Sequence, residues 1–317
     1  MAPEERIELS VVTVSPDGLD ALEDTLAALR AQSGVDRMEL VVVAPREVPA
    51  DPKSLAGFGA TRRVAVGEIE TLAPAIAAGM RAAGGPVVAY AEEHSLPEPG
   101  WAEALISRHR GPWAAVAWSL ENANSKTLTS WAHLLVDFGP AVAPVESGEC
   151  MGPLPWHHVS YKREELLARD DRLEELLETE SLLHDELRAE GRRIYLEGRA
   201  ASRHLNVSRL RPHLASHYFE GRASAATRAR TQRWSPARQL AHAVGSPLIP
   251  LVRLRRLIPD VRRVRARSGR RWALIPRLGL GLAVTALGEA VGYLFGPGRS
   301  RRRLLAVELD RRDHLSD

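Results

Sequence analysis

The chain has 317 residues, of which 44% are hydrophobic and 26% are charged, the balance of an ordinary globular protein. Its single cysteine, Cys150, excludes an internal disulfide framework and fits a reducing compartment. The first six residues contain no apolar run, so we expect no secretory signal.

The net charge of +3 is unevenly distributed along the chain. Residues 203–272 contain 17 arginines but only two acidic residues, Glu220 and Asp260, whereas residues 1–202 are acidic. A basic segment of this kind suits an anionic membrane surface, a nucleic acid or an acidic partner domain. A solvated helix face that docks on the acidic half of the same chain is an equally simple interpretation.

Apolar strand patterns alternate with helical patterns in the first 200 residues. Strands are expected at residues 7–14, 39–44, 63–66, 87–91, 116–120, 159–161 and 193–197. Helices are expected at residues 19–31, 72–83, 101–109, 163–168 and 173–190. Strand–helix–strand units favour a parallel sheet with right-handed crossovers, so we predict an α/β fold with a mixed, mainly parallel sheet of the Rossmann type, flanked by helices.

The composition changes after His204, where arginines become dense. We therefore predict a first domain at residues 1–205 and an arginine-rich helical extension at residues 206–317.

Two acids and a histidine, Glu92-Glu93-His94, follow the apolar strand at residues 87–91. In open α/β sheets, ligands collect outside the carboxyl ends of the strands. Acidic and imidazole side chains packed together there cost folding free energy unless they hold a cation or a polar substrate. Taken alone, an acidic loop after an ordinary strand is the simpler interpretation.

Five segments of the first domain follow one another in an order known from one enzyme family. They are Leu9 to Val14, Ala31-Gln32-Ser33, Met38 to Val43, Pro86 to His94 and Pro97 to Leu105. In this order the chain resembles the inverting family 2 glycosyltransferases over about residues 7–204. The resemblance implies a GT-A fold and the transfer of a sugar from a nucleotide-sugar donor.

On this resemblance, Glu92-Glu93-His94 takes the place of the family's Asp-x-Asp motif. That motif holds a divalent cation that bridges the donor diphosphate. The resemblance therefore implies Mn²⁺ or Mg²⁺ as cofactor, with Glu92 and His94 as ligands, and the imidazole favours Mn²⁺. Glu93 is either a ligand or a donor contact. His204 stands where the family often completes the metal site, although a surface histidine is the alternative.

The resemblance also implies a general base and an acceptor side. Counting back from the Leu187 to Gly191 stop, Glu180 takes the place of the base that deprotonates the acceptor hydroxyl, with Glu178 as the nearest competitor. Trp156 and His158 fall in the acceptor-side segment. Trp156 would stack on a sugar face or fill the core, and His158 would contact the acceptor or the donor, because adjacent histidines seldom point at one ion.

Three departures from the family pattern leave the donor open. Ala44-Pro45 stands where the family has a base-reading aspartate, and the helix at 72–83 has no asparagine near Ala77. The first loop is Ser15-Pro16-Asp17-Gly18, in which Ser15 and Asp17 would contact the donor. These departures support an alternative function, a catalytically inactive glycosyltransferase-like binding or assembly subunit.

The apolar segment at about residues 273–296 is predicted to be an amphipathic helix. One face carries Leu280, Val284, Leu287, Val291 and Leu294. Gly288 and Gly292 make a small-x-x-x-small contact surface. The longest charge-free run, Leu278 to Gly288, is too short for a membrane span. Flanking arginines suit an anionic headgroup layer; packing on the protein or a homodimer contact is the alternative.

Together these patterns lead us to expect a metal-dependent inverting glycosyltransferase. We expect it in the cytoplasm, peripheral at the inner face of the cell membrane, acting on a lipid-linked or cell-envelope glycan acceptor. Nucleic acid is not an expected partner, because no nucleic-acid-binding motif accompanies the arginines.

Overall fold

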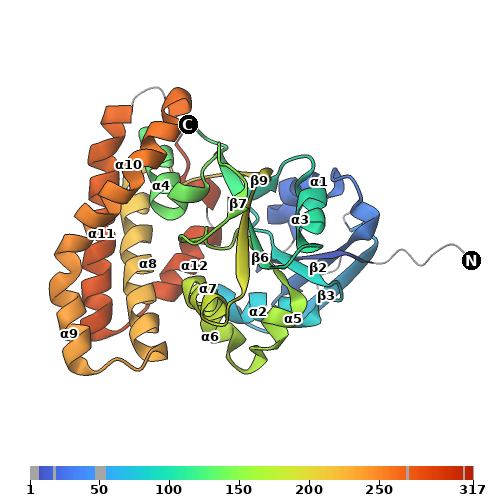
Figure 1. Cartoon of the computed structure of the whole chain (residues 1–317), viewed down its shortest axis with the longest axis horizontal. Helices are drawn as coiled ribbons and strands as arrows, with labels where there is room; N and C mark the ends of the chain where they lie inside the picture. The colour runs from blue at the N-terminus through green and yellow to red at the C-terminus, as the bar shows by residue number, and fades with distance from the viewer. Residues whose placement is uncertain (1–6, 17–18, 47–54, 269–270, 310, 317) are drawn as a thin grey trace, which may run out of the picture. The chain divides into compact units, whose positions relative to one another are not determined.

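The computed structural model describes residues 7–16, 19–46, 55–268, 271–309 and 311–316 (Figure 1). The chain divides into two compact units. The first unit comprises Met1–Glu121 with Val145–His204, and the second comprises Asn122–Pro144 with Leu205–Asp317.

The first unit is built on a nine-stranded mixed sheet, in the order β3-β2-β1-β4-β8-β6-β9-β5 with β7 paired to β9. The strands are β1 (Leu9–Val14), β2 (Met38–Ala44), β3 (Ala60–Ala65), β4 (Val87–Tyr90), β5 (Ser95–Pro97), β6 (Trp113–Asn122), β7 (Gly148–Glu149), β8 (Val159–Lys162) and β9 (Arg193–His204). Strands β1 to β4 are parallel, and β8 joins them antiparallel to β4. The predicted α/β class and the predicted strand positions are confirmed.

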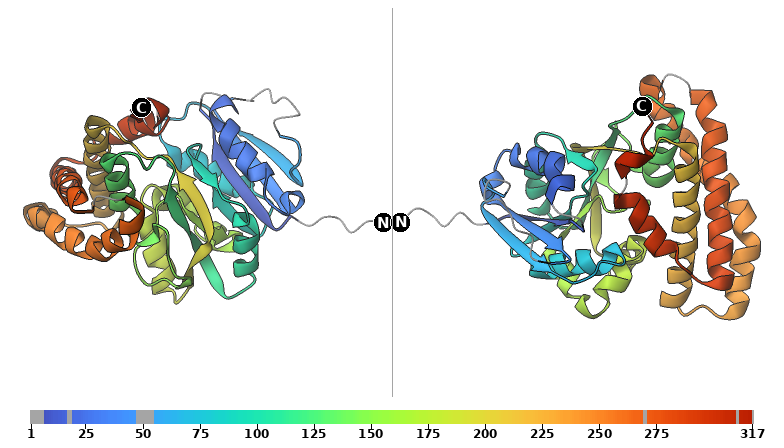
Figure 2. Two further views of the ribbon diagram at one scale, coloured as in Figure 1. Left: turned by 90° about the horizontal axis from the view of Figure 1, so that it is seen from above. Right: turned by 180° about the vertical axis from the view of Figure 1, so that it is seen from behind.

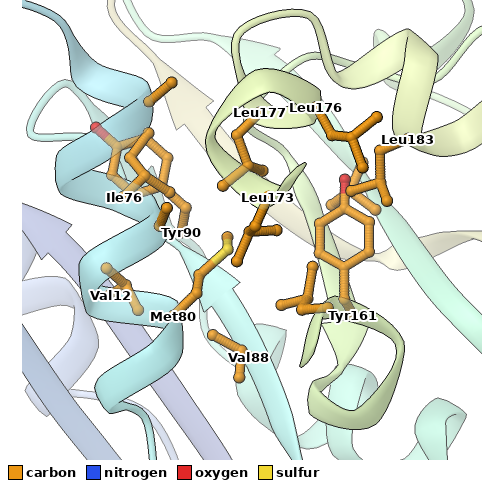
Figure 3. Packing of buried hydrophobic residues seen from close by; sticks show 14 of the residues in the cluster. Val12, Ile76, Met80, Val88, Tyr90, Tyr161, Leu173, Leu176, Leu177 and Leu183 are labelled. Carbon is orange, nitrogen blue, oxygen red and sulfur yellow. The ribbon is translucent and has the colours of Figure 1, made fainter. Parts of the chain in front are cut away.

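Helices cover both faces of this sheet. They are α1 (Glu23–Arg30), α2 (Leu72–Ala82), α3 (Trp101–His109), α5 (Arg163–Leu167), α6 (Leu173–Leu177) and α7 (Glu180–Ala189), with short 3₁₀ turns at Leu19–Leu22, Val35–Arg37 and Asp170–Arg172. Side chains of β1 alternate between the faces, so Val12 packs with α2 and α6 while Val11 packs with α1 and α3. Figure 3 shows the first of these two cores, where Met80 and Tyr161 lie among leucines of α6 and α7.

The predicted continuous helix at residues 173–190 is wrong. The chain leaves the helical conformation at Thr179, which has φ −150° and ψ 82°, and α7 begins anew at Glu180. Because of this break, Glu180 is the first residue of α7, and its carboxylate extends from the start of that helix.

In the residues that the structure describes, helices make up the regular secondary structure of the second unit, apart from Asn122 at the end of β6 (Figure 2). Its α-helices are α4 (Leu128–Phe138), α8 (Leu210–Thr231), α9 (Pro236–Gly245), α10 (Ile249–Ser268), α11 (Arg271–Phe295) and α12 (Ser300–Leu309), and its 3₁₀ turns are η3 (Gly139–Ala141), η5 (Ser246–Leu248) and η6 (Arg311–His314). Pro259 lies inside α10.

The segment Asn122–Pro144 belongs to the second unit, although the predicted boundary near residue 205 assigned it to the first. Its helix α4 is mostly apolar and is buried on nearly every side, with only Leu128 and Asp137 partly exposed. It packs against α10 and α11 of the C-terminal helices. A helix that is apolar all round needs neighbours all round, and these helices supply them.

Helices α8 and α11 meet at the closest approach within the second unit. A Cβ atom added to Gly288 would lie 2.2 Å from the Tyr218 carbonyl oxygen, and one added to Gly292 would lie 2.3 Å from that of Arg222. On the facing helix, a Cβ at Gly221 would lie 2.3 Å from the Thr285 carbonyl. The predicted contact surface of Gly288 and Gly292 is confirmed, and α8 is its partner.

We expect Gly288→Ala to destabilise the chain, because its methyl group forces α8 and α11 apart. Overpacking of this kind costs roughly 1–3 kcal/mol of unfolding free energy. Gly279→Ala in the same helix is the matched control, since an added Cβ there meets nothing within 4 Å. It should be neutral or stabilise by up to about 1 kcal/mol. Urea unfolding monitored by circular dichroism measures both, and equal effects of the two variants would contradict the close contact.

Candidate functional site

A buried carboxylate, Glu92, lies just beyond the carboxyl end of β4. The strand pairing continues to its neighbour, since the Ala91 N–H donates to the Val12 carbonyl at 2.8 Å. Glu92 is only 7% exposed, although its carboxylate has a strong preference for water. Such a group must therefore find its partners within the protein.

Four buried histidines surround Glu92: His94, His157, His158 and His204. We call these five residues the Glu92 cluster. Oε2 of Glu92 lies 3.4 Å from the Nε2 atom of each of His94, His158 and His204. Oε1 lies 2.7 Å from Nδ1 of His157. Both carboxylate oxygens are thus enclosed by imidazole nitrogens.

Strand pairing explains why residues so distant in sequence meet here. Ser95 of β5 lies opposite His204 of β9, which brings His204 beside His94. On the other side, β8 runs antiparallel to β4 with Ser160 opposite Ala89. The residues before β8, His157 and His158, therefore lie beside the residues after β4.

Hydrogen bonds to His158 determine which of its nitrogens carries the proton. Nδ1 lies 2.7 Å from the Trp156 carbonyl oxygen, which can only accept, so Nδ1 is protonated. Nε2 is then the acceptor, and the Ser95 hydroxyl donates to it at 3.0 Å. Burial lowers the pKa of His158 to about 4, so the ring is neutral at pH 7. The one lone pair of Nε2 accepts from Ser95 and lies 3.4 Å from the Glu92 carboxylate, so a cation bound between them would take it in place of the Ser95 hydroxyl.

This arrangement fits a bound cation. An acceptor nitrogen and a carboxylate oxygen repel each other at 3.4 Å unless a positive charge lies between them. Four-coordinate ions with bonds of about 2.0–2.1 Å hold their ligand atoms about 3.3–3.4 Å apart. Glu92, His158 and His204 offer ligand atoms that all lie within 4.8 Å of one another. The donor set is rich in nitrogen, which suits Mn²⁺ or zinc-like ions better than Mg²⁺.

The same neighbours shift the pKa of Glu92. Burial raises the pKa, but the imidazoles of His94 and His158 together with the contacts to His157 and His204 outweigh burial and hold it well below its ordinary value. Glu92 is therefore a carboxylate at neutral pH, the form that binds cations.

A second buried carboxylate, Glu180, is joined to the Glu92 cluster through His157. Oε2 of Glu180 accepts a hydrogen bond from the His157 backbone N–H at 2.8 Å. Burial raises the pKa of Glu180 to about 7, opposed by the interaction with His157 and reinforced by the charge of Glu92. A carboxyl group that titrates near neutral pH can take up a proton during a reaction and release it again.

The structure brings the side chains of His94 and His204 to Glu92, each 3.4 Å from its Oε2. It also places His158, expected on the acceptor side, inside the Glu92 cluster. His157 was considered only as a member of the His157-His158 pair, for which a contact to the acceptor or donor was preferred over a role as metal ligand. Its backbone φ of 61° turns the chain so that two adjacent histidines contact the two oxygens of one carboxylate. In the sequence, the adjacent histidines His157 and His158 were the only indication of this contact. Two adjacent histidines do not predict the left-handed backbone that makes the contact possible.

The other predicted residues lie around this centre. Ser15 is buried just after β1, where its N–H donates to the Val43 carbonyl at 2.8 Å. The Glu93 carbonyl accepts a hydrogen bond from the Thr25 hydroxyl at 2.9 Å. Trp156 is half-buried, with its ring centroid 4.3 Å from that of His157. Asp17 lies outside the described residues.

No protein-family model matches this sequence, and no curated protein matches it significantly. Solved structures do match. A mannosyltransferase from Pyrobaculum calidifontis in complex with GDP-Man and Mn²⁺ has a TM-score of 0.51 and 16% identity, over 90% of this chain and 87% of that chain. The fold is that of the GT-A glycosyltransferases. At this identity the likeness concerns the fold alone.

A second solved structure in this set is S. aureus TarS 1–349. It has 13% identity and a TM-score of 0.46, over 90% of each chain. The same TarS fragment in complex with UDP has 11% identity and a TM-score of 0.47, over 86% of this chain and 89% of that chain.

Proposed function

We propose that this chain is an inverting glycosyltransferase that uses a nucleotide-sugar donor and a divalent cation. The observation that carries the proposal is the Glu92 cluster, in which one carboxylate oxygen lies 3.4 Å from three imidazole nitrogens. It lies at the carboxyl end of a parallel strand, where open α/β sheets bind their ligands. The Mn²⁺ and GDP-Man in the mannosyltransferase of the same fold support this assignment.

Glu92, His94 and His204 would hold the cation, and His158 supplies a further nitrogen. The nitrogen-rich set favours Mn²⁺ over Mg²⁺. When bound, the cation neutralises the charge that develops on the departing nucleoside diphosphate. Ser15, Asp17 and Glu93 are the donor contacts in this proposal.

Glu180 would act as the general base. The acceptor hydroxyl gives its proton to the Glu180 carboxylate, and its oxygen bonds to the anomeric carbon as the bond to the diphosphate breaks. One displacement inverts the anomeric configuration. Since Oε2 already accepts from the His157 N–H, Oε1 is the oxygen that receives the proton. Trp156, beside His157, offers an aromatic face to the acceptor sugar.

Nucleoside diphosphate binding tests the donor assignment. We expect GDP or UDP to raise the Tm of the full chain only when Mn²⁺ is present, because a ligand that binds the folded state stabilises it by about 2.7 kcal/mol at 100 times its Kd. Glu92→Gln should abolish the shift, whereas His242→Gln, at an exposed histidine of α9, should leave it intact. If no nucleoside diphosphate shifts the Tm with Mn²⁺ present, the donor assignment is wrong.

Glu180→Gln tests the base. Transfer should fall by a factor of about 10² to 10⁴, with nucleotide binding unchanged. Because the base must be ionised and its pKa is about 7, the wild-type rate should rise as the pH rises through about 7. This rise should be missing in the variant. Glu178→Gln, two residues earlier and half-buried, is the matched control. An unchanged rate and pH profile in Glu180→Gln would remove Glu180 from the mechanism.

A second candidate function is a catalytically inactive binding or assembly subunit. The observation in its favour is Ala44-Pro45 at the end of β2, where a base-reading aspartate is expected. The two functions separate in the experiments above. A subunit of this kind binds nucleotide without transferring or hydrolysing any sugar, so Glu180→Gln changes nothing that can be measured.

We also propose that the second unit docks on an anionic membrane, where the acceptor is a lipid-linked or cell-envelope glycan. Large apolar side chains are exposed on α9, η5, α10 and α11, namely Leu240, Val244, Leu248, Leu251, Val252, Leu287, Leu294 and Phe295. Exposed Arg238, Arg255 and Arg256 lie on the same helices. Ala273–Phe295 is long and apolar enough to cross a membrane, with mean hydropathy 1.6, but 44% of that window is buried within the protein. Peripheral docking at the cytoplasmic face therefore fits better than a span.

Vesicle flotation tests the membrane proposal. The full chain should float with vesicles of phosphatidylcholine and phosphatidylglycerol, and less so at high salt. Leu251→Glu should weaken flotation, whereas Met151→Glu, a 77% exposed apolar residue of the first unit, should not. The alternative is a homodimer contact. If Leu251→Glu converts a dimer to a monomer and leaves flotation unchanged, this surface is a dimer interface instead.

A further inference from the structure

The second unit contains its own buried histidine cluster, which the proposed transfer reaction does not use. His133 of α4 and His213 and His217 of α8 are at most 3% exposed. His213 and His217 are four residues apart, a spacing that places two imidazoles on one helix face, as in helical zinc sites. With Asp137 of α4, we call these residues the His133 cluster.

One distance in the His133 cluster matches the separation of two ligands of one ion. Nδ1 of His133 lies 3.3 Å from Nδ1 of His213. Nitrogens bound to one tetrahedral zinc at about 2.0–2.1 Å lie about 3.3 Å apart. All three histidines offer nitrogen atoms within 4.8 Å of one another.

Asp137 lies where a carboxylate orients metal-binding histidines. Its Oδ2 is 3.5 Å from Nε2 of His133, and its Oδ1 is 3.4 Å from Nδ1 of His217. A carboxylate at the far nitrogen of an imidazole fixes the tautomer that presents the other nitrogen to an ion. This leaves Nδ1 of His133 and Nε2 of His217 as the presented nitrogens.

Hydrogen bonding alone does not account for the His133 cluster. Among the described residues, Nε2 of His213 and both nitrogens of His217 are buried without a hydrogen-bond partner. Helix α11 closes over them, since a Cβ atom at Gly281 would lie 3.1 Å from Nε2 of His213. Buried polar atoms without partners destabilise a fold unless something binds them.

A neutral hydrogen-bonded pair is the competing explanation for part of the cluster. Nη1 of Arg311 lies 3.0 Å from Nε2 of His133 and can only donate. His133 would then carry its proton on Nδ1 and donate it to His213. This explains the contact between His133 and His213 and leaves Nε2 of His217 without a partner. With an ion on Nδ1 of His133, Nε2 carries the proton and faces Asp137, so Arg311 would give up its hydrogen bond to Nε2 and keep its ion pair with Glu308.

We propose that His133, His213 and His217 form a second metal site, for a zinc-class transition ion, with Asp137 orienting the imidazoles. Three imidazoles with no thiolate suit Zn²⁺, Co²⁺, Ni²⁺ or Cu²⁺ rather than Mg²⁺ or Ca²⁺. The site is structural, because its ligands are buried and join two helices that are 80 residues apart in sequence. It fastens α4, the inserted helix, to α8.

The test is metal stoichiometry in the full chain. Chelator-treated protein is dialysed against micromolar Zn²⁺, and bound zinc is measured by elemental analysis. To remove the contribution of the Glu92 cluster, the experiment is run in a His94→Gln, His204→Gln background. We expect this background to retain one zinc per chain. Adding His213→Gln and His217→Gln should remove it, whereas adding His242→Gln should not.

A second measurement covers the case in which the His213→Gln, His217→Gln variant does not fold. Co²⁺ bound to the His94→Gln, His204→Gln background should give the visible absorption of a tetrahedral, nitrogen-ligated ion, and zinc should displace it and raise the Tm. Retention of one zinc after both His213 and His217 are replaced would overturn the proposal. So would a His94→Gln, His204→Gln background that binds no zinc or Co²⁺. Neither result bears on nucleotide binding, so the two metal assignments stand or fall separately.

Discussion

The burial of one carboxylate, Glu92, constrains the whole first unit. A buried charge is tolerated only when its neighbours offset the lost hydration, and each neighbour comes from a different part of the sheet. His94 follows the same strand, His157 and His158 precede β8, and His204 ends β9. Strand register must therefore be correct on both sides of β4 for these contacts to form. A slip of one residue would turn each histidine to the opposite face.

Only part of the Glu92 cluster could be predicted from the sequence. The residues that could be predicted follow local sequence patterns, and the others depend on backbone conformations that no local pattern encodes. Glu92 and His94 follow a strand that its apolar run makes evident, and His204 follows from the order of segments. His157 depends on a left-handed backbone at a residue that is not glycine, which no local pattern encodes. The break at Thr179 is hidden by a helical pattern that continues across it. Its effect is to put Glu180 at a helix start, in reach of the His157 amide.

The division into two units could also be predicted only in part from local sequence patterns. Arginine density placed it near residue 205, close to where the structure divides. The charge pattern contained nothing about α4, because an apolar helix can be buried in either unit. Its membership is decided by long-range packing on α10 and α11. Because α4 packs within the second unit, its buried His133 contacts His213 of α8.

The glycine contacts between α8 and α11 limit how far α11 can move away from α8. Helices that touch through their backbones lose a closely packed contact when they part, and no gain from lipid burial replaces it. Helix α11 is thus anchored to α8 along the side of Gly288 and Gly292, and only the side bearing Leu280, Leu287 and Leu294 can enter lipid. In the membrane docking proposed above, immersion would be limited to the depth of a side chain. Such attachment would reverse quickly, so the protein could leave one membrane patch and settle on another without unfolding.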